Sequence, residues 1–140
     1  MIGSREPLRR KARRTALIIL YIYDLMNFPL DEIVKEILEK VKLSEKNLEF
    51  LDKLISKIKE NKKIIDKTIK KHLINWKLER LSYIDRAILR IATCEILFFD
   101  DIPPKVSINE AIELAKEFSD EDARRFINGV LDAIYKEINK

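Results

Sequence analysis

Apolar residues recur every three or four positions along most of this 140-residue chain, which is the spacing of one face of an α-helix. A first helix is predicted over residues 8–26, and a short one over residues 31–40. A longer amphipathic stretch begins at Ser44, with Asn61 as a break or kink. Because residues 16–23 are apolar on every side, we expect the first helix to lie centrally in the core.

Capping signals mark further helix starts in the second half of the chain. A hydroxyl residue followed three positions later by a carboxylate can satisfy the free N–H groups of a first helical turn. Three such pairs occur: Ser82 with Asp85, Ser107 with Glu110, and Ser119 with Asp122. The second pair follows a break at Pro103 and Pro104, and its helix is expected to point Glu110, Glu113 and Glu117 outward. The sequence therefore predicts an all-α fold, a compact bundle of about seven helices in a single domain over residues 1–140.

Composition excludes several classes of protein. Hydrophobic residues make up 46% and charged residues 37%, too apolar for a disordered chain and too charged for a membrane protein. Residues 16–23 form the longest apolar run, well short of the roughly 20 residues that cross a bilayer, so no membrane span is expected. The single cysteine, Cys94, cannot form an internal disulfide and is expected in the core, which favours a cytoplasmic location.

Positive charge gathers at the amino-terminal end. Against Glu6 alone, residues 1–14 carry six cations: Arg5, Arg9, Arg10, Lys11, Arg13 and Arg14. Because guanidinium groups bind phosphates bidentately and stack on bases, this arm favours an anionic polymer as partner. Nine lysines between Lys53 and Lys77 are more simply explained as a solvated helix face, and eight carboxylates lie between Asp100 and Asp122.

The predicted first helix offers a candidate RNA surface. Arg10, Arg14 and Tyr21 fall on one stripe, and Arg9 and Arg13 share a second. Guanidinium groups that lead to a ring suit single-stranded RNA, since a stacked base contributes about 1–3 kcal/mol. The alternative for Tyr21 is that it fills the core. The RNA role requires that the guanidinium groups reach solvent and are not neutralised by carboxylates of the same chain.

Residue sets for catalysis are missing from the sequence. There is no glycine-rich phosphate loop, no Cys/His cluster for a metal, and the one histidine, His72, has no serine or cysteine at a telling spacing. We therefore expect neither an enzyme nor a bound cofactor.

Two residues inside predicted helices call for a physical reason. Glu95 follows the apolar stripe of the helix predicted over residues 83–99, so its buried carboxylate is expected to bond an arginine or a helix N-terminus. Gly129 lies inside the last helix, where glycine costs about 1 kcal/mol relative to alanine. Close helix packing or the approach of a ligand to the backbone would explain it.

Several long strings resemble those of the NusB family of transcription antitermination factors. They are residues 9–13 (RRKAR) with Leu20 and Tyr21, residues 84–92 (IDRAILRIA) with Glu95, residues 103–115 ending INEAIELA, and residues 126–132 (FINGVLD). The resemblance implies an all-helical factor that binds the boxA element of nascent ribosomal RNA. It also implies pairing with NusE, a small-subunit ribosomal protein, and action within the RNA polymerase antitermination complex.

Carried over residue by residue, the resemblance implies roles for particular side chains. RNA would be bound by Arg9, Arg10, Lys11, Arg13, Arg14, Tyr21, Asp122, Arg125, Phe126 and Asn128. NusE would be faced by Asp85 and Arg86. Ser119 stands where family members often have glycine, which bears on the turn into the last helix. A homodimer also stays open, since family members can self-associate.

Three other functions are alternatives. The first is an α-helical adaptor whose basic arm binds an acidic protein partner. The second is a helix-turn-helix DNA binder, which is disfavoured because Asp31 and Glu32 begin the short helix where basic side chains would be needed. The third is an RNA-modifying enzyme, which lacks its cofactor motifs.

Overall fold

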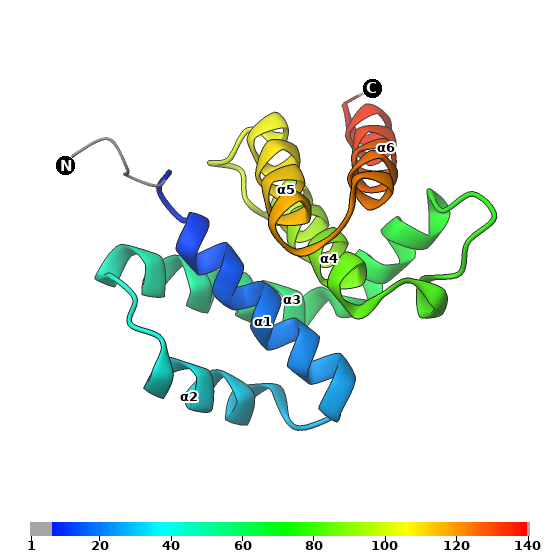
Figure 1. The fold of residues 1–140 in the computed structure, drawn as a ribbon. Helices are drawn as coiled ribbons and strands as arrows, with labels where there is room; N and C mark the ends of the chain where they lie inside the picture. Colours follow the sequence, from blue (N-terminus) through cyan, green and yellow to red (C-terminus); the bar gives the residue numbers. More distant parts are fainter. Residues whose placement is uncertain (1–6, 140) are drawn as a thin grey trace.

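The computed structural model describes residues 7–139, and this part of the chain is a bundle of helices with short connections (Figure 1). The elements are α1 (Arg10–Met26), α2 (Leu30–Lys40), α3 (Glu45–Lys71), a 3-10 turn (Leu78–Arg80), α4 (Tyr83–Phe98), α5 (Pro104–Phe118) and α6 (Glu121–Ile138). The all-α prediction is confirmed. Its count of about seven is close to the six α-helices described, because Asn61 leaves the helical region inside α3, as predicted, and divides that helix in two. Arg5, part of the predicted basic arm, lies outside the described residues.

The central helix is α4. Every residue from Ala87 to Glu95 is buried, and α4 packs against α1, α3, α5 and α6. In Figure 1, α1 and α2 lie on one side of α4, and α5 and α6 lie on the other, while α3 runs past α4 and also contacts α6. The expectation that α1 is enclosed on every side is therefore wrong. The central helix is α4 instead, and Ile18 of α1 remains 37% exposed. One side of α1 stays open to solvent.

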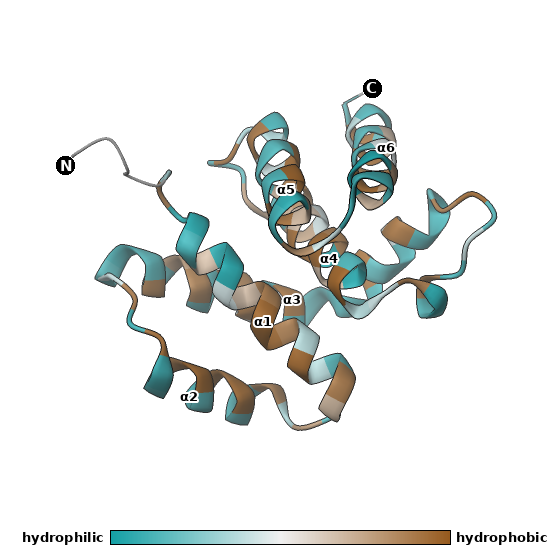
Figure 2. Cartoon of the chain, in the orientation of Figure 1, coloured by the Kyte–Doolittle hydropathy of each residue, from teal (hydrophilic) through white to brown (hydrophobic). Residues whose placement is uncertain are grey.

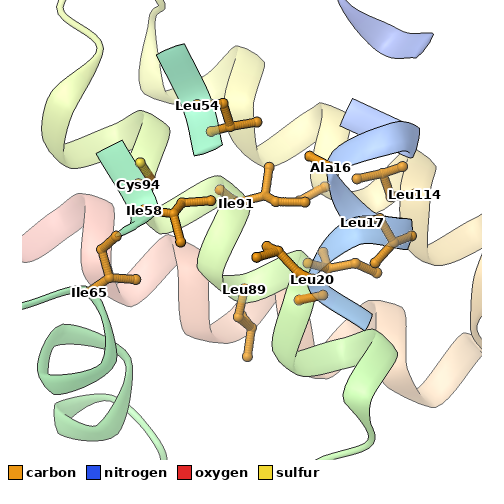
Figure 3. Packing of buried hydrophobic residues seen from close by; sticks show 14 of the residues in the cluster. Ala16, Leu17, Leu20, Leu54, Ile58, Ile65, Leu89, Ile91, Cys94 and Leu114 are labelled. Atoms are coloured by element: carbon orange, nitrogen blue, oxygen red, sulfur yellow. The ribbon is translucent and has the colours of Figure 1, made fainter. Parts of the chain in front are cut away.

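The hydrophobic core extends through both sides of the bundle. Figure 3 shows Leu17 and Leu20 of α1, Ile58 of α3 and Ile91 of α4 converging in it. Cys94 lies in the same cluster and is fully buried, which confirms its expected place in the core. Burial raises the pKa of the Cys94 thiol to about 12, because a thiolate there would lose its hydration.

Helix starts agree with the capping signals only in part. Ser82 caps α4 as predicted, since its Oγ accepts from the backbone N–H of Asp85 at 3.0 Å. By contrast, α5 begins at Pro104 rather than at the Ser107 pair, because the fixed φ of proline suits a first helical turn. Ser107 lies inside the helix, where its Oγ donates to the Glu95 carboxylate at 2.8 Å.

The turn from α5 into α6 also differs from the prediction. Asp120, not Ser119, caps α6, and its Oδ1 accepts from the N–H of Ala123 at 2.8 Å. Ser119 Oγ instead donates to Asp85 Oδ1 at 2.9 Å, which ties this turn to the start of α4. No helix within residues 7–139 has both the length and the apolar character that spanning a membrane requires.

Candidate nucleic-acid interface

Four arginines of the basic arm, at positions 9, 10, 13 and 14, lie at the N-cap and in the first turns of α1. Figure 2 shows that this end of α1 is hydrophilic, whereas most of the rest of the helix is hydrophobic. Each guanidinium group meets a carboxylate: Arg9 meets Asp101 at 3.3 Å, Arg10 meets Glu110 at 2.7 Å, Arg13 meets Glu95 at 2.7 Å, and Arg14 meets Glu117 at 2.9 Å. The requirement that these cations are not neutralised within the chain is therefore not met as stated, and an RNA role is left only to pairs whose carboxylate a ligand can displace. Because the four pairs differ in burial, they differ in whether a ligand can replace the carboxylate.

The Arg13 pair is closed to solvent. Arg13 Nε and Nη2 donate to the two oxygens of Glu95 at 2.8 and 2.7 Å, and the side chains are 4% and 1% exposed. Breaking a buried pair leaves an uncompensated charge and costs about 3–5 kcal/mol. The expectation that Glu95 bonds an arginine is confirmed. The Arg13 side chain is enclosed between α1 and α4, so its expected contact with RNA would require this pair to open and stays a prediction.

The Arg10 pair is intermediate. Arg10 Nε and Nη2 donate to Glu110 at 3.0 and 2.7 Å, and Arg13 Nη1 lies 3.6 Å from the same carboxylate. Glu110 is buried, so the expectation that it points outward is wrong. Its place in the interior of α5 turns it towards α1, where the two guanidinium groups compensate its charge. The main role of Arg10 is therefore structural, because its bonds to Glu110 join α1 to α5.

Arg9, Lys11 and Arg14 form the solvent-open part of the cluster. The Arg14–Glu117 and Arg9–Asp101 pairs are exposed, and the Arg9 guanidinium also lies 4.7 Å from the centre of the Phe50 ring. Lys11 is exposed and makes no ion pair with any residue of 7–139. Exposed ion pairs contribute about 0–1 kcal/mol, so a phosphate group can replace these carboxylates at little cost.

Tyr21 lies farther along α1, beside the start of α4. It is half-buried, and its ring meets Tyr83 edge to face with centroids 6.2 Å apart. Arg86 lies over the other ring of this pair, 5.1 Å from the Tyr83 centroid, and its Nη2 donates to the carbonyl oxygens of Glu79 and Leu81. Only 14% of the Arg86 side chain is exposed, which leaves it little surface for a protein partner.

The predicted residues of α6 divide between two cavities. Asp122 and Phe126 line one of about 370 Å³, together with Asp85 and Trp76. Trp76 is 57% exposed, and its ring lies edge to face with Phe126 at 6.4 Å. The cavity thus brings together two residues predicted for RNA and one of the two residues predicted for NusE. Trp76 was not predicted; the available signal was a lone tryptophan between two helices.

The second cavity lies between α5 and α6 and has a volume of about 320 Å³. Arg125 and Asn128 line it together with Lys116 and Arg124, neither of which was predicted. Near it on α6, a Cβ added at Gly129 would meet nothing within 4 Å, so close packing does not explain this glycine. Among residues 7–139, no three His, Cys, Asp or Glu side chains gather as a metal site.

Comparison with known proteins agrees with this architecture. The NusB family model matches residues 10–136. The transcription antitermination protein NusB of Chloroherpeton thalassium is 44% identical over 131 residues, a match that covers 93% of this chain and 62% of the relative's length.

Two solved structures extend the comparison to three dimensions. The structure of T. maritima NusB has a TM-score of 0.85 at 39% identity and covers 95% of this chain and 94% of its own. A crystal structure of the antitermination factors NusB and NusE in complex with double-stranded RNA has a TM-score of 0.84 at 35% identity. The match covers 92% of this chain and 96% of the chain in that structure. With both sequence and helix arrangement matched over most of its length, the chain belongs to the NusB family, whose members are transcription antitermination factors rather than enzymes.

Proposed function

We propose that this chain is a transcription antitermination factor that binds boxA-type single-stranded RNA in nascent ribosomal transcripts. NusE is its partner, and the pair promotes processive transcription by RNA polymerase. The observation that carries the proposal is the solvent-open basic edge of α1, formed by Arg9, Lys11 and Arg14. A relative with the same fold was solved with NusE and double-stranded RNA, which supports RNA and NusE as ligands but does not bear on the single-stranded boxA sequence.

RNA binds by exchange at this edge. A phosphate takes the place of Glu117 at Arg14 and of Asp101 at Arg9, while Lys11 adds a charge that needs no such exchange. Arg10 and Arg13 keep their carboxylates and hold α1 in place. Tyr21, half-buried against Tyr83, offers only part of its ring to a base.

The residues of α6 supply the rest of the RNA surface. Asp122 is almost fully exposed and Phe126 packs on Trp76, so an unpaired base has a polar group and aromatic surfaces within one cavity. Arg125 and Asn128 reach RNA from the other side of the helix.

NusE binds beside this surface, at the start of α4. Asp85 lines the cavity that holds Trp76 and Phe126, and its carboxylate also accepts from Ser119. Arg86 shapes this face through its contact with Tyr83 rather than by reaching the partner. A second protein bound next to the RNA adds contacts and so raises the affinity of the complex.

The test is fluorescence anisotropy with three RNAs: a boxA oligonucleotide, its scrambled sequence and a duplex, each with and without NusE. We expect preference for single-stranded boxA, tighter binding with NusE, and weaker binding by the Lys11→Ala/Arg14→Ala double variant. The Lys35→Ala/Lys40→Ala double variant, which removes two exposed lysines from α2, is the matched control and should bind normally. Equal binding of boxA and scrambled RNA would instead favour an adaptor whose basic arm binds an acidic protein.

A further inference from the structure

The cavity between α5 and α6 has a basic lining that the α1 edge does not explain. Lys116 comes from α5, and Arg124 and Arg125 come from the first turns of α6, with Ile112 and Asn128 completing the wall. Glu121 is the one acidic residue in this lining.

Arg124 differs from the arginines of α1. It is half-buried, and its side chain makes no ion pair or hydrogen bond with any residue of 7–139. Its neighbours are paired: Lys116 Nζ lies 3.0 Å from Glu113, and Arg125 Nη2 lies 3.0 Å from Glu121. Both pairs are exposed, and each joins two residues of the same helix, the first in α5 and the second in α6. Ion pairs of this kind are weak, so another anion can replace the carboxylate. Arg124 acts on Glu113 through its charge, but it bonds directly to no carboxylate of residues 7–139, so this partly enclosed guanidinium group is available to an anion.

The cavity and the α1 edge are separated by α5 alone. Glu113 lies between them, and its pKa is held below its ordinary value by a hydrogen bond from Lys116, by that lysine's charge, and by the charges of Arg10 and Arg124. A helix with its side chains is about 10–12 Å wide, so a short RNA strand that leaves Arg14 can cross α5 and reach Arg124.

We propose that Lys116, Arg124 and Arg125 bind a backbone phosphate of RNA, with Arg124 as its principal ligand. The planar fork of Arg124 fits two phosphate oxygens, while Lys116 adds a point charge from the opposite wall. The RNA path thus continues from the first helix across α5 to the last. This inference rests on the proposed function and adds residues to it.

A salt series separates this site from the rest of the surface. The affinity of the full chain with NusE for boxA RNA is measured for Arg124→Gln, for Arg124→Lys and for Lys136→Gln. Lys136 is an exposed α6 lysine paired with Asp132 and serves as the control. We expect Arg124→Gln to weaken binding several-fold and to reduce the log–log salt slope by about 0.7, the value for one phosphate contact on a single strand. Arg124→Lys should restore the slope, and Lys136→Gln should leave affinity and slope unchanged.

Thermal melting shows whether each variant is folded. An unchanged affinity and slope in folded Arg124→Gln, while the unmodified chain binds boxA RNA, would overturn the phosphate site and leave the proposed function standing. Equal losses in Arg124→Gln and Lys136→Gln would also overturn it, since the effect would then be one of overall charge. Absence of RNA binding by the unmodified chain would overturn both proposals.

Discussion

Arg13 and Glu95 bind each other through two hydrogen bonds of 2.8 and 2.7 Å, although 82 residues separate them in the sequence. The pair joins the basic end of α1 to the central helix α4, and Ser107 of α5 donates to the same carboxylate. The buried Glu95 carboxylate thereby joins three helices, α1, α4 and α5. The exposed cations of α1 have a defined position because this buried pair holds the helix beneath them.

Removal of Glu95 should destabilise the fold strongly. In Glu95→Ala, Arg13 is left buried without its carboxylate, and the free energy of unfolding should fall by about 3–5 kcal/mol. Urea unfolding followed by circular dichroism measures it. The control is Glu113→Ala, which breaks an exposed pair with Lys116 and should change stability by less than about 1 kcal/mol. A Glu95→Ala variant as stable as the unmodified chain would mean that the pair has no structural role.

Removal of a competing carboxylate should strengthen RNA binding. In Glu117→Gln the exposed partner of Arg14 loses its charge, so a phosphate no longer competes with this carboxylate for the guanidinium group. Affinity for boxA RNA should rise up to about fivefold, the equivalent of 1 kcal/mol for an exposed pair. Anisotropy titration measures it, with Glu137→Gln as control because Glu137 pairs with Lys71 instead. Weaker binding by Glu117→Gln would argue against exchange at Arg14.

The thiol of Cys94 should resist alkylation in the folded chain. Burial raises its pKa from 9.0 to about 12, so at pH 8.5 it holds roughly a thousandth of the thiolate of an exposed cysteine. Iodoacetamide labelling followed by mass spectrometry should show almost no reaction until denaturant is added. Rapid labelling under native conditions would contradict the burial.

The same shift makes stability depend on alkaline pH. Because the folded-state pKa is raised, the unfolded chain ionises first, and the free energy of unfolding should fall as pH rises from 9 towards 12. The contribution of this group is at most about 1.4 kcal/mol per pH unit. Cys94→Ala is the comparison, and an identical pH profile in both proteins would exclude this contribution.

Substitution of Gly129 should separate stability from binding. Alanine fits the open space around this position and should raise the free energy of unfolding by about 1 kcal/mol. Packing does not account for the glycine, and the other reason expected from the sequence is the approach of a ligand to the backbone, which the RNA proposal supplies. Affinity for boxA RNA should therefore fall in Gly129→Ala, and a stabilised variant that binds RNA normally would leave the glycine without this role.

Features set by local sequence were predicted well. Asn61 breaks α3, Ser82 caps α4, and Glu95 lies on a buried stripe, because each depends on neighbours within one or two helical turns. The second capping pair misled because a serine and a glutamate three positions apart are equally compatible with a helix interior. A preceding proline that can start the helix itself, Pro104, decided the outcome.

The pairing of the arginines could not be predicted. Arg10 and Glu110 are 100 residues apart, and only the packing of α5 against α1 brings them together. The sequence showed a basic arm and an acidic stretch but not that one neutralises much of the other. The division of α6 likewise depends on its neighbours, because Phe126 meets Trp76 from the loop before α4 while Arg125 lies beside Lys116 of α5.

The most direct test of the RNA surface is a titration of the ¹H–¹⁵N spectrum of the chain with boxA RNA. The largest shifts should fall on residues 9–14 at the start of α1, on Lys116, and on residues 122–129 of α6. Shifts gathered instead along the lysines of α3, from Lys53 to Lys71, with the first turns of α1 and α6 unmoved, would contradict the account.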